Sequence, residues 1–173
     1  MIDEARHSRL SGALTRFGLL LAAIVIVCDQ ANKWWLLQVY RIEDKGRIEL
    51  TPFLDLIYVK NTGISYGMFS LDNAQGQYLL AGVAVVVSLG MFVWLTRTGS
   101  YLIAVSLGLI IGGALGNAVD RLSLGGVADF YSFHVFGYYW YIFNLADVAI
   151  VAGAAGLLYD SLIASRKKAP KEG

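Results

Sequence analysis

The chain of 173 residues has little charge, little proline and a single cysteine. Only 16% of its residues are charged and 57% are hydrophobic, whereas about a quarter of a typical soluble domain is charged. The net charge of +1 excludes a basic nucleic-acid binder, and the apolar content excludes a disordered chain. One cysteine cannot form a disulfide framework, and two prolines favour long helices. The composition indicates a small membrane protein with no nucleic-acid partner.

Four long apolar segments set the expected architecture. Because the hydrocarbon core of a bilayer is about 30 Å thick, a helix needs roughly 20 apolar residues to cross it. The expected spans lie at about residues 14–37, 75–96, 100–119 and 144–163. We expect one integral-membrane domain over residues 1–173, with a membrane α-helical fold of four transmembrane helices.

Basic residues indicate which ends of these spans face the cytoplasm, where Lys and Arg are enriched. They gather in both terminal tails and between the second and third spans, at Arg6, Arg9, Arg16, Arg97, Arg166, Lys167, Lys168 and Lys171. Four spans with both termini in the cytoplasm satisfy all three groups. The N-terminal segment is also compatible with a signal peptide ending near Cys28, but Val27 is larger than such cleavage sites accept. We therefore expect a retained helix.

The two outer segments are expected to differ in structure. In the outer β-region, at about residues 40–70, the alternation at 47–51 and the apolar run at 54–59 predict a small periplasmic β-sheet on the membrane surface. In the second segment, residues 121–143, we expect a periplasmic loop that closes over the site. Its aromatic run at 138–141 suits the membrane interface.

Four aspartates from different segments are expected at one depth, near the outer surface. At 1.5 Å per helical residue, Asp29 lies roughly 22 Å along the first span and Asp120 about 28 Å along the third. Asp147 opens the fourth span from the outside, and Asp129 lies in the loop before it. Because charges in or beside spans are costly, such residues are functional candidates.

Each of these aspartates also has a purely structural explanation. Asp29 and Lys33 are four residues apart, so they share a helix face and can neutralise each other. Asp120 can mark the water boundary beside Arg121, and Asp147 can cap the start of its helix. Asp129 can be an ordinary acidic residue of a loop.

Asp129 and Asp147 stand out because apolar residues flank both and no basic residue pairs with either in the sequence pattern. Placed face to face, two carboxylates cannot both ionise at low cost, so they share one proton and titrate as a pair. The charged carboxylate can take a proton from water while the neutral one protonates a carbonyl oxygen. This is the arrangement that an aspartic protease needs.

Two other functions remain open at this point. A serine–lysine dyad would use Lys33 with Ser65 or Ser70, and a small proton-coupled transporter or channel would use the membrane acids as relays. A transporter requires acids along a full transmembrane path, whereas we expect them to stop at the outer layer. Metal and phosphate chemistry have little support, because His7 and His134 lack partners at metal-ligand spacing and no phosphate-binding loop occurs.

Five motifs in order resemble one family. They are Asp29-Gln30-Ala31-Asn32-Lys33, Asn61-Thr62-Gly63, Gly112-Gly113-Ala114-Leu115-Gly116-Asn117-Ala118-Val119-Asp120-Arg121, Val127-Ala128-Asp129-Phe130 and Phe143-Asn144-Leu145-Ala146-Asp147. Each is weak alone, but all five in this order on four spans are specific. From about Arg16 to the basic tail, the chain resembles the lipoprotein signal peptidases, the type II signal peptidases of bacteria.

This resemblance implies an aspartyl endopeptidase of the bacterial inner membrane, with both termini in the cytoplasm and its active site near the outer leaflet. Such an enzyme removes signal peptides from diacylglyceryl-modified prolipoproteins and cleaves just before the lipidated cysteine. Asp129 and Asp147 match the catalytic dyad. The positions that match site-support or substrate-contact residues are Asn61, Gly63, Asn117, Arg121, Asn144, Asp29, Lys33 and Asp120.

The resemblance also carries expectations about partners. It implies no metal and no cofactor, prolipoproteins and membrane lipid as partners, globomycin-like cyclic peptides as inhibitors, and a monomer. Two departures from the family pattern occur: Ile64, Ser65 and Tyr66 follow the second motif where small residues and then Phe or Trp are usual, and Gly126 stands where a bulkier residue is often found. Neither departure touches the two aspartates, so they bear on substrate contact and loop rigidity.

Overall fold

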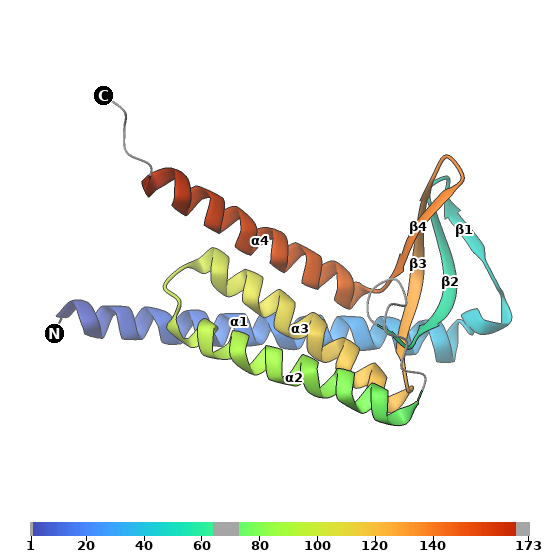
Figure 1. The fold of residues 1–173 in the computed structure, drawn as a ribbon, viewed down its shortest axis with the longest axis horizontal. Helices are drawn as coiled ribbons and strands as arrows, with labels where there is room; N and C mark the ends of the chain where they lie inside the picture. Colours follow the sequence, from blue (N-terminus) through green and yellow to red (C-terminus); the bar gives the residue numbers. More distant parts are fainter. Residues whose placement is uncertain (1, 64–72, 169–173) are drawn as a thin grey trace.

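Four long helices and one sheet make up the protein in the computed structural model, which describes residues 2–63 and 73–168 (Figure 1). The helices are α1 (Ile2–Trp34), α2 (Ala74–Arg97), α3 (Tyr101–Ser123) and α4 (Leu145–Lys168). A π-helical turn (Trp35–Val39) extends α1, and a 3₁₀ turn (Ile42–Asp44) follows it. Each long helix contains a stretch that is long and apolar enough to cross a membrane. The expected multi-pass membrane fold is confirmed.

α3 is the central helix of the bundle. It contacts α1, α2 and α4, and 61% of its membrane-spanning stretch is buried, against 17% for each of the other three. Glycine permits these close contacts. A Cβ at Gly112 would lie 2.7 Å from the backbone oxygen of Ala22 on α1, and a Cβ at Gly113 would collide with the backbone oxygen of Ala146 on α4.

The sheet lies at one end of the helical bundle and runs across the helix axes, and the start of α1 and the end of α4 lie at the opposite end (Figure 1). Its strands are β1 (Ile48–Thr51), β2 (Leu54–Asn61), β3 (Val127–Val135) and β4 (Tyr138–Phe143), all antiparallel and in that spatial order. β1 and β2 confirm the two strands expected in the outer β-region. Residues 64–70 of that region lie outside the described residues.

Residues 121–143 differ from the loop that the sequence predicts, because they end α3 and then form the β3–β4 hairpin. Local periodicity does not reveal this hairpin. The first four residues of β3 are all buried, so they do not alternate, and β4 opens with the aromatic run. Pairing with a distant strand defines β3: Val59 on β2 lies opposite Asp129. Asp129 is therefore held in a strand rather than in a loop.

A separate core fixes the sheet to the C-terminal end of α1. Its buried members come from the π turn, the 3₁₀ turn, β2 and β3, and they are Leu36, Ile42, Leu56, Ala128 and Phe130. Because successive side chains of a strand point to opposite faces, burying Phe130 in this core turns Asp129 to the other face. That face meets the start of α4, as the hydrogen bond from Asn144 to Asp129 confirms.

Candidate active site

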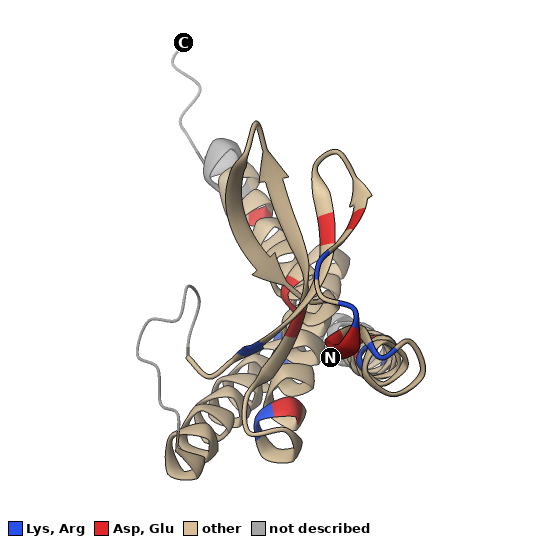
Figure 2. Cartoon of the chain, turned by 90° about the vertical axis from the view of Figure 1, so that its right-hand side faces the viewer, with Lys and Arg blue, Asp and Glu red and all other residues tan. Residues whose placement is uncertain are grey.

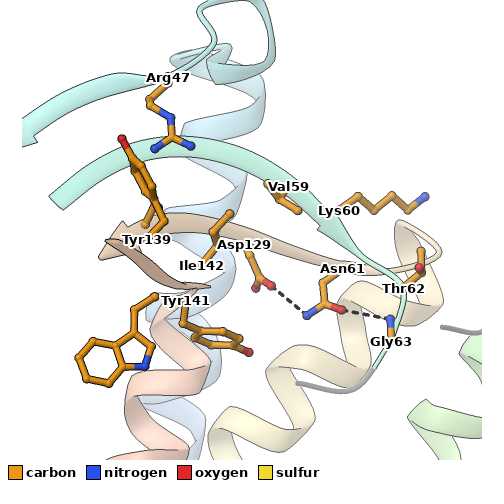
Figure 3. Close-up of a pocket in the computed structure, with 12 residues that line it drawn as sticks. Arg47, Val59, Lys60, Asn61, Thr62, Gly63, Asp129, Tyr139, Tyr141 and Ile142 are labelled. Carbon is orange, nitrogen blue, oxygen red and sulfur yellow. Dashed lines mark hydrogen bonds between the residues drawn. The ribbon is translucent and has the colours of Figure 1, made fainter. Parts of the chain in front are cut away.

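Asp129 is buried on β3 between two asparagine side chains. Its carboxylate oxygens accept hydrogen bonds from Asn61 Nδ2 at 3.1 Å and from Asn144 Nδ2 at 2.6 Å. Asn61 ends β2, and its Oδ1 accepts the backbone N–H of Gly63 at 3.0 Å, which fixes the orientation of the amide (Figure 3). The pairing of β2 with β3 therefore places an oriented donor beside the carboxylate.

Asp147 lies in the first turn of α4, three residues after the capping residue Asn144. Asn144 Oδ1 accepts the backbone N–H of Asp147 at 3.0 Å, and Asp147 Oδ2 accepts the backbone N–H of Asn144 at 3.3 Å. This is the reciprocal geometry of a capping box. The other oxygen of Asp147 accepts Asn117 Nδ2 at 2.9 Å. Asp147 therefore caps its helix, as the structural explanation predicts, and also belongs to the polar cluster.

Two asparagines join these carboxylates into one network. Asn144, which is fully buried, donates through Nδ2 to both Asp129 and the Oδ1 of Asn117, the latter at 3.1 Å. Asn117 donates in turn to Asp147. Neither aspartate has an ion-pair partner among the residues that the structure describes. Within the described part of the chain, amide donors thus orient two carboxylates that form no ion pair.

Burial raises the pKa of Asp129 to about 7, and the negative charge of Asp147 adds to the rise. The amide hydrogen bonds from Asn61 and Asn144 act in the opposite direction, because they favour the charged form. Because Asn144 hydrogen-bonds both carboxylates, they lie close enough to interact electrostatically. Two such acids are suited to sharing one proton near neutral pH.

Lys33 forms a buried ion pair with two further carboxylates beside this network. Its Nζ lies 2.7 Å from Asp29 Oδ2 and 2.7 Å from Asp120 Oδ2, and its side chain is only 3% exposed. The Nζ also donates to Asn117 Oδ1 at 3.3 Å. The predicted pairing of Asp29 with Lys33 is confirmed. Asp120 does not mark a water boundary beside Arg121, because it is buried against Lys33.

The Lys33 cluster holds the backbone directly before each site aspartate. Asp120 Oδ2 accepts the N–H of Ala128 at 3.1 Å, and Asp29 Oδ1 accepts the N–H of Ala146 at 3.0 Å. Figure 2 shows that acidic segments of the chain lie both on the strands and on the helices next to them. One lysine therefore connects, through two carboxylates, the backbone positions that precede Asp129 and Asp147.

Arg121 links the end of α3 to the turn that follows β2. Its Nη1 donates to the backbone oxygen of Asn117 at 3.3 Å, and its Nη2 donates to the backbone oxygen of Gly63 at 3.2 Å. The same turn holds Asn61 against Asp129. Arg121 therefore stabilises the position of a hydrogen-bond donor to Asp129.

Two hollows meet at the aspartates. One, of about 440 Å³, crosses a face of the sheet from Asp129 toward β1 and β4 (Figure 3). The other, of about 300 Å³, borders Asp147 and lies between α2, α3 and α4. Asn61, Gly63 and Tyr141 border both hollows. An extended chain can therefore pass from the spans, beside both carboxylates, onto the sheet.

The structure brings all ten predicted site residues into this region. Sequence reasoning missed a role for Gln30, whose Nε2 donates to Asp120 Oδ1 at 2.9 Å and to the backbone oxygen of Gly116 at 3.2 Å. It also missed the N–H groups of Ala128 and Ala146, since a backbone donor leaves no signal in residue type. Ser65 and Ser70, of the alternative dyad, and the departures Ile64, Ser65 and Tyr66 lie outside the described residues.

Gly126, the other departure from the family pattern, makes room for a side chain of β2. A Cβ at this position would lie 3.0 Å from Cγ and Cε of Lys60 and 3.1 Å from the backbone oxygen of Asn61. The stem of Lys60 therefore packs where a bulkier residue at 126 would stand.

Comparison with known proteins gives a consistent family. The family model described as signal peptidase (SPase) II matches residues 21–163. A lipoprotein signal peptidase of Methylocella silvestris is 56% identical over 149 residues, covering 86% of this chain and 87% of that protein. One of Beijerinckia indica is 47% identical over 153 residues, covering 88% of this chain and 92% of that protein.

Solved structures agree with the sequence relatives. A structure described as a bacterial membrane enzyme, solved by the in meso method, superposes with a TM-score of 0.76 at 27% identity and covers 91% of this chain and 94% of its own. The match of the family model over most of the chain, the two relatives and this fold lead to one assignment. The chain belongs to the signal peptidase II family.

Proposed function

We propose that the protein is a lipoprotein signal peptidase of the aspartic type, with Asp129 and Asp147 as its catalytic residues. The observation that carries this proposal is the pair of carboxylates that form no ion pair among the described residues and are joined by Asn144. The family assignment supports the substrate class: prolipoproteins that carry a diacylglyceryl group, cleaved just before the lipidated cysteine. No cofactor takes part in this mechanism.

The two carboxylates share one proton in the resting enzyme. Since its pKa is raised to about 7, Asp129 holds this proton near neutral pH and donates it to the carbonyl oxygen of the scissile bond. Asp147 accepts a proton from the attacking water. The roles reverse when the tetrahedral intermediate collapses and the amine leaves. Asn61, Asn117 and Asn144 keep the carboxylates oriented through both steps.

The two hollows support a direction for the substrate. The hollow that borders Asp147 is lined by apolar side chains of the spans, among them Leu80, Val83, Val87 and Ile150. This lining suits the signal segment or the acyl chains, which arrive from the bilayer. The chain beyond the scissile bond then leaves over the sheet, through the hollow that borders Asp129.

The same arrangement supports a location and a set of partners. The start of α1 and the end of α4 lie opposite the sheet (Figure 1), and the basic residues near both favour the cytoplasm for them. The active site is then near the outer leaflet of the bacterial inner membrane. Membrane lipid surrounds the exposed apolar helix faces, the enzyme acts as a monomer, and globomycin-like cyclic peptides inhibit it by blocking the two aspartates.

Contacts of Lys33 argue against the serine–lysine alternative. A lysine base must reach a serine hydroxyl, whereas two buried carboxylates hold Lys33 Nζ at 2.7 Å each and leave its side chain only 3% exposed.

The transporter alternative predicts a continuous path of acids. The acids do not stop at the outer layer, as the sequence reasoning has it, because Asp160 lies toward the other end of α4. Residues 148–159 between it and Asp147 carry no charge, a gap of about 20 Å along the helix. This gap argues against a relay along α4.

Processing of a diacylglyceryl-modified prolipoprotein by purified protein in detergent tests the proposal. Asp129→Asn and Asp147→Asn should each lower the cleavage rate by at least about a hundredfold, because each removes one partner of the acid–base pair. Asp160→Asn is the matched control: it changes an aspartate of α4 outside the network and should cleave at the wild-type rate. Wild-type rates for either site variant would exclude the catalytic pair.

A further inference from the structure

The hollow over the sheet ends at a fixed arginine. Arg47, directly before β1, and Tyr139, on β4, both line this hollow, and the Arg47 guanidinium lies 4.3 Å from the Tyr139 ring centre (Figure 3). β1 and β4 are opposite edges of the sheet, so the sheet curls enough for side chains from its two edges to meet over one face. A chain that leaves Asp129 along this hollow therefore meets Arg47.

Two neighbours hold the guanidinium in place, and His134 contacts both of them. Asp55 on β2, only 3% exposed, accepts Arg47 Nη1 at 2.7 Å through Oδ2. The other oxygen of Asp55 lies 3.1 Å from His134 Nε2. The His134 ring packs on Tyr139, with ring centres 5.0 Å apart. Arg47 is therefore backed by a buried carboxylate and stacked on an aromatic ring, so little side-chain entropy remains to be lost when it binds a ligand.

Most donors of this arginine remain available. A guanidinium has five N–H donors, and the Nη1 bond to Asp55 is the only hydrogen bond of Arg47 within the described part of the chain. Its side chain is 41% exposed. A planar, immobilised fork of donors matches a carboxylate, which can accept two hydrogen bonds from it.

The geometry points to Arg47 as a specificity-determining residue that binds an acidic side chain of the substrate beyond the cleavage site. This inference rests on the proposed function, since it assumes that the mature part of a prolipoprotein crosses the sheet. Ile48 lies opposite Leu56, and Val59 lies opposite Asp129. Arg47 and Asp129 are therefore separated by two residues along a strand and by two strand spacings. The distance is on the order of 12 Å, the length of three to four extended residues.

The charges along the hollow also favour binding of an acidic side chain at Arg47 rather than next to the cleavage site. Next to the cleavage site, the negative charge that Asp129 and Asp147 share disfavours an acidic side chain. At the far end of the hollow, Asp55 offsets the charge of Arg47, so the expected preference comes from short-range hydrogen bonds rather than long-range attraction. For a partly exposed pair, we expect a preference of about three- to tenfold.

Cleavage of a matched substrate series measures this preference. The substrates are variants of one diacylglyceryl-modified prolipoprotein, each with Asp, Asn or Lys at one of the second to fifth residues after the cleavage site. For each substrate, kcat/KM is determined with the wild-type enzyme, Arg47→Gln and Arg47→Lys. For the wild type, kcat/KM should be highest with Asp, lower with Asn and lowest with Lys at the third or fourth residue. The values for Asp and Asn should differ by about three- to tenfold. Arg47→Gln should lower this ratio to about one, and Arg47→Lys, which keeps the charge but not the fork, should retain part of it.

The ratio between two substrates on the same enzyme does not change if a variant contains less folded protein. Arg41→Gln is the control, because Arg41 is 72% exposed, pairs with Asp44 and does not line the hollow. It should keep the wild-type ratio. Equal rates for Asp and Asn substrates at all four positions, or a preference that persists in Arg47→Gln, overturn the inference while leaving the peptidase function intact. If the wild type cleaves none of the substrates, both the inference about Arg47 and the proposed peptidase function are wrong.

Discussion

The side-chain Nδ2 of Asn144 donates a 2.6 Å hydrogen bond to Asp129, while Oδ1 of the same side chain caps the helix that carries Asp147 by accepting the Asp147 N–H at 3.0 Å. One buried residue therefore sets the relative position of the two carboxylates. Its capping role and its donor role use different atoms: Oδ1 accepts from Asp147, whereas Nδ2 donates to Asp129. A substitution can separate the two roles.

Asn144→Ser keeps a side-chain acceptor for the helix cap but removes the amide donor. We expect the free energy of unfolding to fall by about 1 kcal/mol or less and kcat to fall by about ten- to a hundredfold. Thermal unfolding and prolipoprotein cleavage measure the two effects. Asn73→Ser is the matched control, since Asn73 Oδ1 caps α2 by accepting the N–H of Gly76 at 2.7 Å. Equal kcat values for the two variants would contradict the role of Asn144.

The pKa of Asp129, raised to about 7, predicts the alkaline limit of activity. The pair needs one shared proton, so kcat/KM should follow a bell-shaped profile whose falling limb lies near pH 7. The hydrogen bond from Asn61 favours the charged carboxylate and therefore lowers this pKa. Asn61→Ala removes it, so the falling limb should move to higher pH even as the rate declines.

Asn32→Ala is the control for the pH profile. Asn32 hydrogen-bonds Tyr131 rather than either aspartate. The falling limb of the kcat/KM profile of Asn32→Ala should therefore coincide with that of the wild type. A limb that stays in place or moves to lower pH in Asn61→Ala would show that this amide does not tune Asp129.

Lys33 is expected to be more important for stability than its single charge suggests. Lys33→Met leaves Asp29 and Asp120 buried without their cation, and loss of one partner of a buried ion pair costs about 3–5 kcal/mol. Unfolding by SDS in mixed micelles measures the change. Lys45→Met is the control, because Lys45 is exposed and contacts the Tyr40 ring at 3.9 Å, so about 1 kcal/mol or less is expected. Similar losses for both variants would exclude a stabilising Lys33 cluster.

Residue types and chain order were sufficient to predict the helices and to single out Asp129 and Asp147, which the structure places in one hydrogen-bond network. A charge among apolar residues is visible in one dimension, and so is the i to i+4 spacing of Asp29 and Lys33. The partner of Asp120 is not visible in this way, because the adjacent Arg121 is the obvious candidate in sequence, whereas the bundle brings Lys33 from another helix. The same holds for β3, which is defined by pairing with β2 and not by its own alternation.

Contacts through the backbone form the second class that sequence reasoning does not reach. The N–H groups of Ala128 and Ala146 bind the carboxylates of the Lys33 cluster, yet alanine suggests no polar role. A glycine can likewise position an active site, because the absence of a side chain lets two helices approach closely. Gly113 on α3 faces the backbone oxygen of Ala146, which directly precedes Asp147.

Gly113→Ala tests this contact. An added methyl group would collide with backbone, which cannot rotate away as a side chain can, so the start of α4 must shift. The shift would disturb the bond from Ala146 N–H to Asp29 and the position of Asp147. We expect a loss of about 1–3 kcal/mol in stability and a fall in kcat of about tenfold or more, since small displacements of a catalytic group are costly.

Gly82→Ala makes the same change in another membrane-spanning helix where no atom lies within 4 Å of the added Cβ. Alanine is the better helix former by about 1 kcal/mol, so this variant should unfold at the same or a higher temperature and cleave at the wild-type rate. The difference between the two variants then isolates the contact with Ala146 from the general effect of adding a methyl group to a helix. If Gly113→Ala also cleaves at the wild-type rate, the start of α4 tolerates displacement and Asp147 does not depend on close packing against α3.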